Sequence, residues 1–253
     1  MNKIPLSIQL YSLRALPGLT DILDTAQAAG YQHVELIGSH LDQAAQVKAE
    51  LDARHLKVSS AHVSMAALRD RFDAVMQACR LLQFKQLFMP AVPPDERNSP
   101  EPYWTALGRE LGQMALRAKD HGIELGYHNH HWEMAPQSNG LTALDCLFAG
   151  ADKTPLTWQA DVAWLVRGGV DPVQWLNKYK NRVVSVHAKD LAPAGTCVDE
   201  DGWADVGHGV LDWRHALASA CVACGAQWLV AEHDKPNDAQ RFARRSHAFL
   251  QSL

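Results

Sequence analysis

The chain contains few cysteines and no segment long and apolar enough to anchor it in a membrane. Only five of its 253 residues are cysteines, an odd number scattered along the sequence. A chain of this size buries a core without covalent cross-links, so we expect no disulfides. No stretch approaches the roughly 18 apolar residues of a membrane span, and the first residues lack the apolar run of a signal peptide. These absences predict a cytoplasmic protein without a membrane partner.

The sequence also lacks an excess of basic charge and a glycine-rich phosphate loop. Lys and Arg number 24 against 28 Asp and Glu, which gives a formal net charge of -4. Proteins that bind nucleic acid need a basic patch or stripe, so we expect no nucleic-acid partner. The segment after the first apolar run reads SLRALPG, without the GxGxxG spacing of a dinucleotide site. A small-molecule partner is the better expectation.

No linker rich in proline, glycine or serine divides the chain, which predicts a single domain over residues 1–253. Short apolar runs alternate with longer stretches of helical spacing, the pattern of a parallel sheet built from βα units. The candidate strands are Pro5–Tyr11, His33–Ile37, Lys57–Val63, Gln86–Pro90, Glu124–His130, Leu156–Val162, Val183–Lys189 and Trp228–His233. Eight successive units in about 250 residues favour a closed (β/α)₈ barrel, the TIM barrel, over an open sheet.

Glycines mark the ends of several predicted helices. Gly30, Gly122 and Gly225 each stand just before a candidate strand, where a left-handed residue closes a helix. Cys221 and Cys224 lie in the alanine-rich stretch ALASACVACGA, without a second cysteine pair to complete a zinc site. We therefore assign these two cysteines to helix packing.

Imidazole and carboxylate side chains stand at the ends of four consecutive candidate strands. They are His128, Asp161, His187 and Glu232. Ligands of a (β/α)₈ barrel bind at the C-terminal ends of its strands. Any one of these residues alone also fits a capping role, but four on neighbouring strands favour one divalent ion with positions open for substrate oxygens. The long irregular stretch 192–209, after the seventh strand, is typical of an active-site loop.

Other polar residues near strand ends are candidates for binding the substrate. Gln9, Glu35 and His62 follow the first three strands, although a lone histidine such as His62 is nearly as often structural. Trp164 either stacks on the apolar face of a sugar or closes the barrel mouth. Lys189 is a candidate acid or base if burial or a metal ion lowers its pKa.

Several motifs together resemble the xylose-isomerase-like sugar phosphate isomerase/epimerase family. They are GYHNHHWE, DVAWLVRGGVDP, HAKD, DVGHGVLDW and VAEHD, with SIQLYSLR and GYQHVEL at the first two strands. The resemblance implies a (β/α)₈ barrel with one divalent ion, which is manganese, magnesium, zinc or cobalt. Activities in the family include ketose 3-epimerisation, aldose–ketose isomerisation, inosose dehydration and dehydroshikimate dehydration. A related branch is a DNA-repair endonuclease with three metal ions.

The resemblance implies that Asp161, His187 and Glu232 are metal ligands. The ketose epimerases carry a further glutamate ligand on the fifth strand, where this chain has His128, and the nearest downstream carboxylate is Glu133. The fourth ligand is therefore His128 or a neighbour. In the epimerases the two glutamates exchange protons across the substrate, and only Glu232 of that pair is present here.

These observations predict a metal-dependent isomerase, epimerase or dehydratase that acts on a sugar or keto-polyol through an enediolate. Besides Glu232, the acid/base candidates are His128, His130, Glu133 and Lys189. One alternative is a metal-dependent endonuclease of the repair branch, against which the net charge argues. Another is a barrel that binds a sugar without catalysis. Because barrels of this kind commonly associate, we also expect a homo-oligomer.

Overall fold

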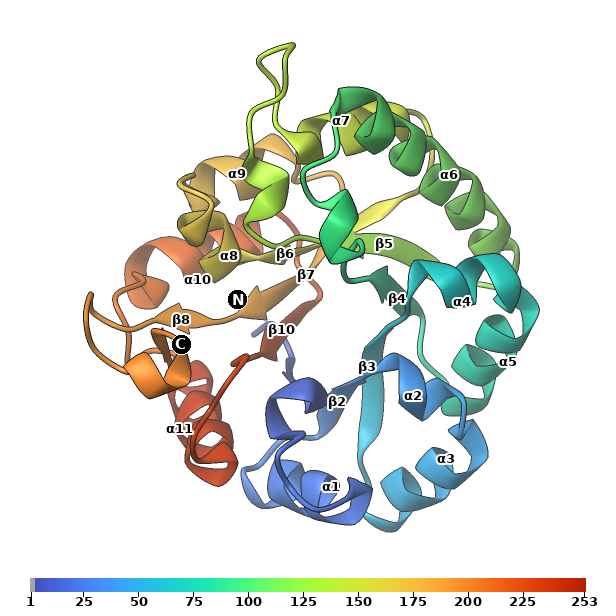
Figure 1. Cartoon of the computed structure of the whole chain (residues 1–253). Coiled ribbons are helices and arrows are strands. Elements are labelled where there is room, and N and C mark those ends of the chain that lie inside the picture. The colour runs from blue at the N-terminus through green and yellow to red at the C-terminus, as the bar shows by residue number, and fades with distance from the viewer. Residues whose placement is uncertain (1–2) are drawn as a thin grey trace.

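The computed structural model describes residues 3–253 and contains a closed barrel of parallel strands. The barrel strands are β1 (Leu6–Gln9), β2 (His33–Leu36), β3 (Lys57–His62), β4 (Gln86–Met89), β5 (Glu124–His128), β6 (Thr157–Asp161), β7 (Val183–Ala188) and β10 (Trp228–Ala231). They are hydrogen-bonded in the cyclic order β1-β10-β7-β6-β5-β4-β3-β2. Figure 1 shows the strands at the centre and the helices around them. The predicted (β/α)₈ barrel is confirmed.

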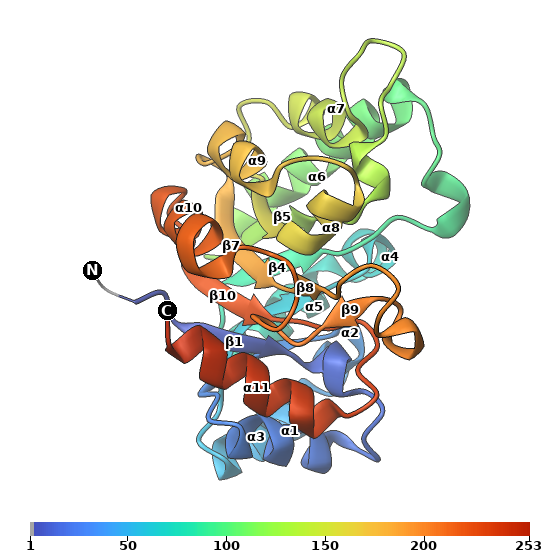
Figure 2. The ribbon, with the colours of Figure 1, turned by 90° about the vertical axis from the view of Figure 1, so that its left-hand side faces the viewer.

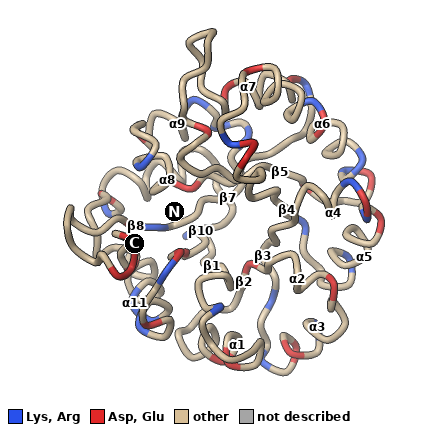
Figure 3. The backbone as a smooth tube through the Cα atoms, viewed as in Figure 1, with Lys and Arg blue, Asp and Glu red and all other residues tan. Residues whose placement is uncertain are grey.

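Helices form the outer ring and bury the outer face of the strands. They are α1 (Leu19–Ala28), α2 (Gly38–Leu41), α3 (Ala44–Ala53), α4 (Met65–Asp70), α5 (Phe72–Leu82), α6 (Glu101–Asp120), α7 (Ala143–Gly150), α8 (Val162–Arg167), α9 (Pro172–Lys178), α10 (Ala218–Ala223) and α11 (Ala239–Gln251). The last helix, α11, packs beside α1 and β1, so the two ends of the chain meet (Figure 2). Acidic and basic positions are mixed around this ring (Figure 3). Within residues 3–253, no helix has the length and apolarity that a membrane crossing requires.

Several strands are shorter than the sequence pattern predicts, because side chains at their ends start the next turn. Gln9 ends β1, and its side-chain oxygen accepts a hydrogen bond from Tyr11 N at 3.0 Å, which begins a 3₁₀ turn. Asp161 ends β6 and accepts from Trp164 N at 2.9 Å, as the N-cap of α8. Tyr11 therefore lies in this turn, whereas the sequence pattern predicts it at the end of the first strand.

The helix ends and the cysteines follow the prediction. Gly30, Gly122 and Gly225 have φ values of 101°, 74° and 81°, a left-handed conformation that closes α1, α6 and α10. Cys221 in α10 and Cys224, which caps its C-terminal end, are buried, and all five cysteines, which lie within the described residues, are free thiols. The predicted absence of disulfides is confirmed for this fold.

The predicted active-site loop is ordered by one buried carboxylate. Part of it, β9 (Trp203–Ala204), pairs antiparallel with β8 (Asp190–Leu191). The Asp190 side chain accepts hydrogen bonds from the backbone N–H groups of Leu191, Gly207, Gly209 and Leu211, at 2.9 to 3.2 Å. This short hairpin holds residues 190–211 beside the C-terminal end of β7.

Candidate metal centre and active site

The four predicted metal ligands converge at the C-terminal end of the barrel. They are His128 at the end of β5, Asp161 at the end of β6, His187 in β7 and Glu232 directly after β10. Each offers one ligand atom, and these atoms all lie within 4.8 Å of one another. Protein nitrogen and oxygen ligands lie at about 2.0–2.2 Å from zinc, so ligands on opposite sides of one ion are separated by about twice that distance. The cluster therefore has dimensions that suit one ion.

Asp161 carries a buried oxygen that makes no hydrogen bond with residues 3–253. Its Oδ1 accepts from the N–H of Trp164, whereas its Oδ2 is buried and has no hydrogen-bond partner among residues 3–253. Burial raises the pKa of Asp161 to about 7, although the nearby Lys189 charge opposes this shift. Buried polar atoms are almost always hydrogen-bonded, and the nearest cation to this oxygen among residues 3–253 is Lys189 at 3.6 Å, so the oxygen is free to ligate a metal ion. The donor set of two imidazoles and two carboxylates suits a divalent metal ion.

His187 lies between two carboxylates. Its Nδ1 is 3.0 Å from Glu232 Oε2, and its Nε2 is 2.6 Å from Glu35 Oε1. Burial disfavours the charged imidazole, but Glu232 and Glu35 outweigh burial and raise the pKa of His187 to about 10. Burial, together with the neighbouring His187 and His62, holds the pKa of His128 well below its usual range. His128 is thus neutral, whereas a metal ion held by His187 would have to replace the proton on one of its ring nitrogens.

Lys189 is a buried counter-ion of the same cluster. Its Nζ lies 2.6 Å from Asp234 Oδ2, 3.0 Å from Glu232 Oε2 and 3.6 Å from Asp161 Oδ2. Burial alone would lower the pKa of Lys189, but these carboxylates raise it above its ordinary value. The pKa of Lys189 is therefore raised and not lowered by its surroundings, because three acidic groups stabilise the ammonium charge.

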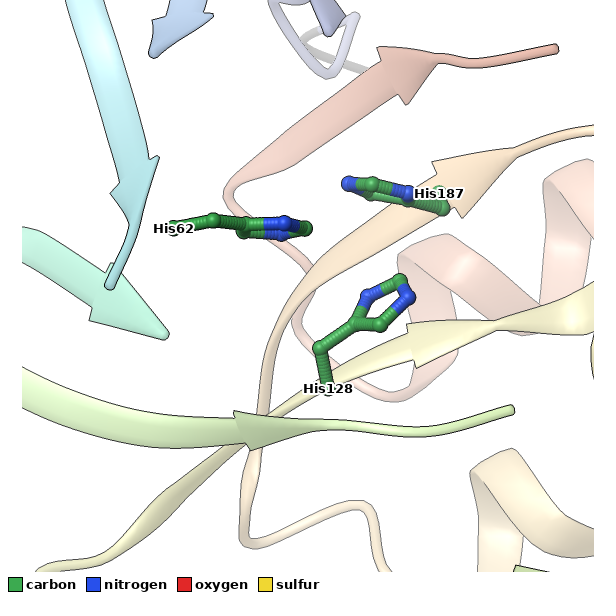
Figure 4. Close-up of side chains that lie close together, drawn as sticks. All are labelled: His62, His128 and His187. Atoms are coloured by element: carbon green, nitrogen blue, oxygen red, sulfur yellow. The ribbon is translucent and has the colours of Figure 1, made fainter. Parts of the chain in front are cut away.

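An open cavity of about 950 Å³ lies above the cluster. Of the residues singled out from the sequence, His62, His128, His130, Trp164 and Glu232 line it. Figure 4 shows His62 from β3, His128 from β5 and His187 from β7 close together inside the barrel. The cavity is large enough for a sugar or polyol, and the ligand cluster lies at its floor.

The structure places Gln9 and Glu35 elsewhere than in the predicted substrate pocket. Both side chains are fully buried inside the barrel, and neither lines the cavity. Gln9 Nε2 donates to Glu35 Oε1 at 2.7 Å. Burial disfavours the Glu35 charge, but the neighbouring His62 and His187 keep its pKa at about 2. Both residues belong to the buried interior of the barrel, where Glu35 Oε1 also contacts His187 Nε2 at 2.6 Å.

Glu133 is also placed away from the cavity wall. Its Oε1 accepts a hydrogen bond from the Tyr127 hydroxyl at 2.6 Å, and its Oε2 accepts from His130 N at 2.8 Å. Burial raises the pKa of Glu133 to about 7. With both oxygens occupied by the protein, Glu133 shapes the loop after β5, and the prediction that it transfers a proton is not supported by its position.

One wall of the cavity is aromatic, and it includes Arg97, which the sequence analysis did not identify. The His130 and Trp132 rings stack at 4.2 Å with an interplanar angle of 11°. The Arg97 guanidinium carbon lies 3.9 Å from the centre of the Trp132 ring. Trp164 meets Trp203 edge to face, with ring centres 4.7 Å apart. Arg97 comes from the loop after β4, whose sequence PPDERNSP carries no spacing that would have identified it.

Fold and site together define a TIM barrel with candidate metal ligands at the C-terminal ends of its strands. The chain belongs to the family described as xylose isomerase-like TIM barrel, whose model matches residues 23–253. It is 26% identical over 188 residues to an inosose dehydratase from Lacticaseibacillus casei, an alignment that covers 67% of this chain and 62% of that protein. The chain thus spans about three fifths of the length of this relative.

Solved structures show the same fold. A sugar phosphate isomerase/epimerase from Parabacteroides distasonis superposes with a TM-score of 0.78 at 21% identity, covering 100% of this chain and 95% of that one. The IolI protein with a bound zinc atom superposes with a TM-score of 0.73 at 15% identity, covering 98% of this chain and 95% of that one. At these identities the likeness establishes the architecture.

Proposed function

We propose that the protein is a divalent-metal-dependent enzyme that isomerises, epimerises or dehydrates a sugar or keto-polyol. The ion would be held by the predicted set His128, Asp161, His187 and Glu232. The observation that carries this proposal is the four-ligand cluster itself, in which the buried Oδ2 of Asp161 accepts no hydrogen bond from residues 3–253. A bound divalent ion acts as a Lewis acid, which lowers the pKa of a C–H group between a carbonyl and a hydroxyl.

Glu232 is the base in this proposal. Although burial opposes its charge, Lys189 and His187 keep the pKa of Glu232 well below its usual range, so the side chain is a carboxylate. Among residues 3–253, the Glu232 side chain makes hydrogen bonds with His187 and Lys189, and Oε2 is the atom that takes part in both. Glu232 also lines the cavity, which leaves Oε1 available for the substrate proton. Lys189 then serves to orient Glu232, because its own proton is held by three carboxylates.

His130 is the second proton-transfer candidate. It lines the cavity, and its ring lies 5.1 Å from that of His128. Burial and the nearby Lys189 charge hold the pKa of His130 well below its usual range, so its ring is neutral. Its Nδ1 has no partner among the described residues. Return of a proton to the opposite face of the same carbon would give epimerisation, and return at the neighbouring carbon would give isomerisation. Loss of a β-hydroxyl as water would give dehydration, which the similarity to inosose dehydratase supports.

Metal analysis and a proton-exchange screen test the proposal together. We expect about one ion per chain by elemental analysis, and loss of a substrate α-proton signal in D₂O when the protein and Mn²⁺ are mixed with a substrate. The panel comprises keto-inositols, ketohexoses and 3-keto-glycosides, followed by NMR. Near three ions per chain would indicate the repair-nuclease alternative. A protein that binds no ion and exchanges no proton would be a binding barrel, and the enzyme proposal would be abandoned.

A further inference from the structure

Beneath the candidate metal centre, Gln159 of β6 is in contact with both Glu35 and two histidines. Gln159 Nε2 lies 2.5 Å from Glu35 Oε2 and 3.2 Å from Ser185 Oγ. Gln159 Oε1 lies 2.7 Å from His62 Nε2 and 3.0 Å from His128 Nδ1. An ionised carboxylate only accepts hydrogen bonds, so the amide nitrogen has to face Glu35. The hydrogen-bonding chemistry of its neighbours therefore determines the orientation of the Gln159 amide.

This orientation decides which nitrogen of each histidine carries the hydrogen. An amide oxygen only accepts, so His62 Nε2 and His128 Nδ1 both have to donate to Gln159 Oε1. His62 Nε2 also lies 3.3 Å from Glu35 Oε1, a second acceptor on the same side. The lone pair of neutral His128 is then on Nε2, and that of His62, when neutral, is on Nδ1.

Glu35 likewise determines which ring nitrogen of His187 carries a hydrogen. Its Oε1 lies 2.6 Å from His187 Nε2, while its Oε2 also accepts from Ser60 Oγ at 2.5 Å. Because Glu35 holds the Nε2 hydrogen, Nδ1 is the nitrogen left to ligate a metal. That atom is 3.0 Å from Glu232 Oε2 and 3.9 Å from Asp161 Oδ2, on the side of the ligand cluster.

We propose that Glu35 and Gln159 are positioning residues that set the histidine tautomers, so that His128 Nε2 and His187 Nδ1 are the metal-ligating nitrogens. This inference rests on the metal centre of the proposed function and adds its supporting layer. A histidine whose ligating nitrogen carries a hydrogen has no lone pair to offer a metal. Loss of an outer partner of this kind typically weakens metal affinity by about 10- to 100-fold. The proposal gives Glu35, which the sequence places among substrate-binding residues, a different role.

Zinc binding by purified variants tests whether Glu35 and Gln159 contribute to metal affinity. We expect Gln159→Met and Glu35→Gln to raise the Kd for Zn²⁺ by about 10- to 100-fold, measured by competition with a chromophoric chelator. The matched control is Ser7→Ala, because Ser7 Oγ bonds Ser59 Oγ at 2.7 Å in the same buried interior without touching a histidine. Its zinc affinity should stay within about threefold of the wild type. Folded Gln159 and Glu35 variants with wild-type zinc affinity would overturn the proposal.

The tautomers themselves are measured by ¹⁵N NMR of protein labelled at histidine. In the metal-free wild type we expect the His128 hydrogen on Nδ1, and in the zinc-loaded wild type the His187 hydrogen on Nε2. Gln159→Met should release His128 into a mixture of tautomers, an effect that a merely structural role would not produce. A wild-type His128 with its hydrogen on Nε2 would refute the inference even if zinc binds. A wild type that binds no divalent ion would instead refute the metal centre, while the His128 measurement still tests the tautomer assignment.

Discussion

The ammonium group of Lys189 lies 3.0 Å from Glu232 Oε2, and the Lys189 side chain is fully buried. A protein cation thus shares a carboxylate with the site proposed for a metal cation. In the absence of metal, this contact compensates part of the negative charge that Asp161, Glu232 and Asp234 bring to the barrel mouth. If the site holds a metal ion, we expect Lys189 to link the stability of the fold to the occupancy of the site.

We expect Lys189→Met to destabilise the metal-free protein by about 3–5 kcal/mol, because removing one partner of a buried ion pair leaves uncompensated carboxylates. Urea unfolding in EDTA measures this loss. Adding Zn²⁺ should restore more stability to the variant than to the wild type. Lys178→Met is the control, because Lys178 is 48% exposed in its pair with Asp145 and such pairs contribute about 0–1 kcal/mol. Equal losses in the two variants would contradict the counter-ion role.

Glu232→Gln should lower turnover by at least about 10²-fold, since the amide keeps the shape of the side chain but removes its charge and basicity. Zinc or manganese affinity should fall less than turnover, because Asp161 and His187 remain. Steady-state rates on the substrate found by the proton-exchange screen provide the measurement. Glu110→Gln is a suitable control, because Glu110 pairs with Arg69 on the outer surface. Near-normal turnover in the Glu232 variant would exclude the base assignment.

The buried carboxyl of Glu133 should give the fold a pH dependence. Its folded-state pKa of about 7 exceeds the ordinary value of 4.5, so the native state binds the proton more tightly than the unfolded state. Stability from this group is therefore greatest at low pH and decreases by up to about 1.4 kcal/mol per unit as the pH rises from 4.5 to 7.

The comparison with Glu133→Gln isolates this effect. Urea unfolding in EDTA at pH 5, 6 and 7 should show the wild type losing stability relative to the variant as the pH rises. The variant also loses one hydrogen bond to Tyr127 or His130, but that loss does not depend on pH over this range. A wild-type-to-variant difference that stays constant from pH 5 to 7 would show that Glu133 titrates near its ordinary pKa.

The cysteines should differ in reactivity. Cys197 is partly exposed, whereas Cys79, Cys146, Cys221 and Cys224 are buried. Burial also raises the pKa of the Cys221 thiol, which keeps it protonated. Brief alkylation of the native protein, followed by peptide mass spectrometry, should label Cys197 first and the other four only after unfolding. Early labelling of Cys221 or Cys224 would show that α10 opens locally.

The sequence was sufficient to predict the barrel and the group of side chains that forms the candidate metal cluster. Alternating apolar runs and helical stretches define βα units, and glycines such as Gly30 mark helix ends through their left-handed conformation. The candidate ligands Asp161 and His187 were identifiable because parallel strands bring their C-terminal ends to one face of a barrel. The barrel prediction depends on local sequence patterns, and the prediction of the ligand group depends on a general property of the fold.

Only the tertiary structure decided the roles of the remaining polar residues. Glu35 and Gln159 lie in a buried layer because strand register and the tilt of neighbouring strands determine the depth of each side chain, and no local pattern encodes depth. The raised pKa of Lys189 likewise depends on Asp161, Glu232 and Asp234, which other strands and loops bring within 3.6 Å of its nitrogen. The sequence determined which chemical groups reach the barrel mouth, and the packing of distant segments decided which of them face the cavity and which are held beneath it.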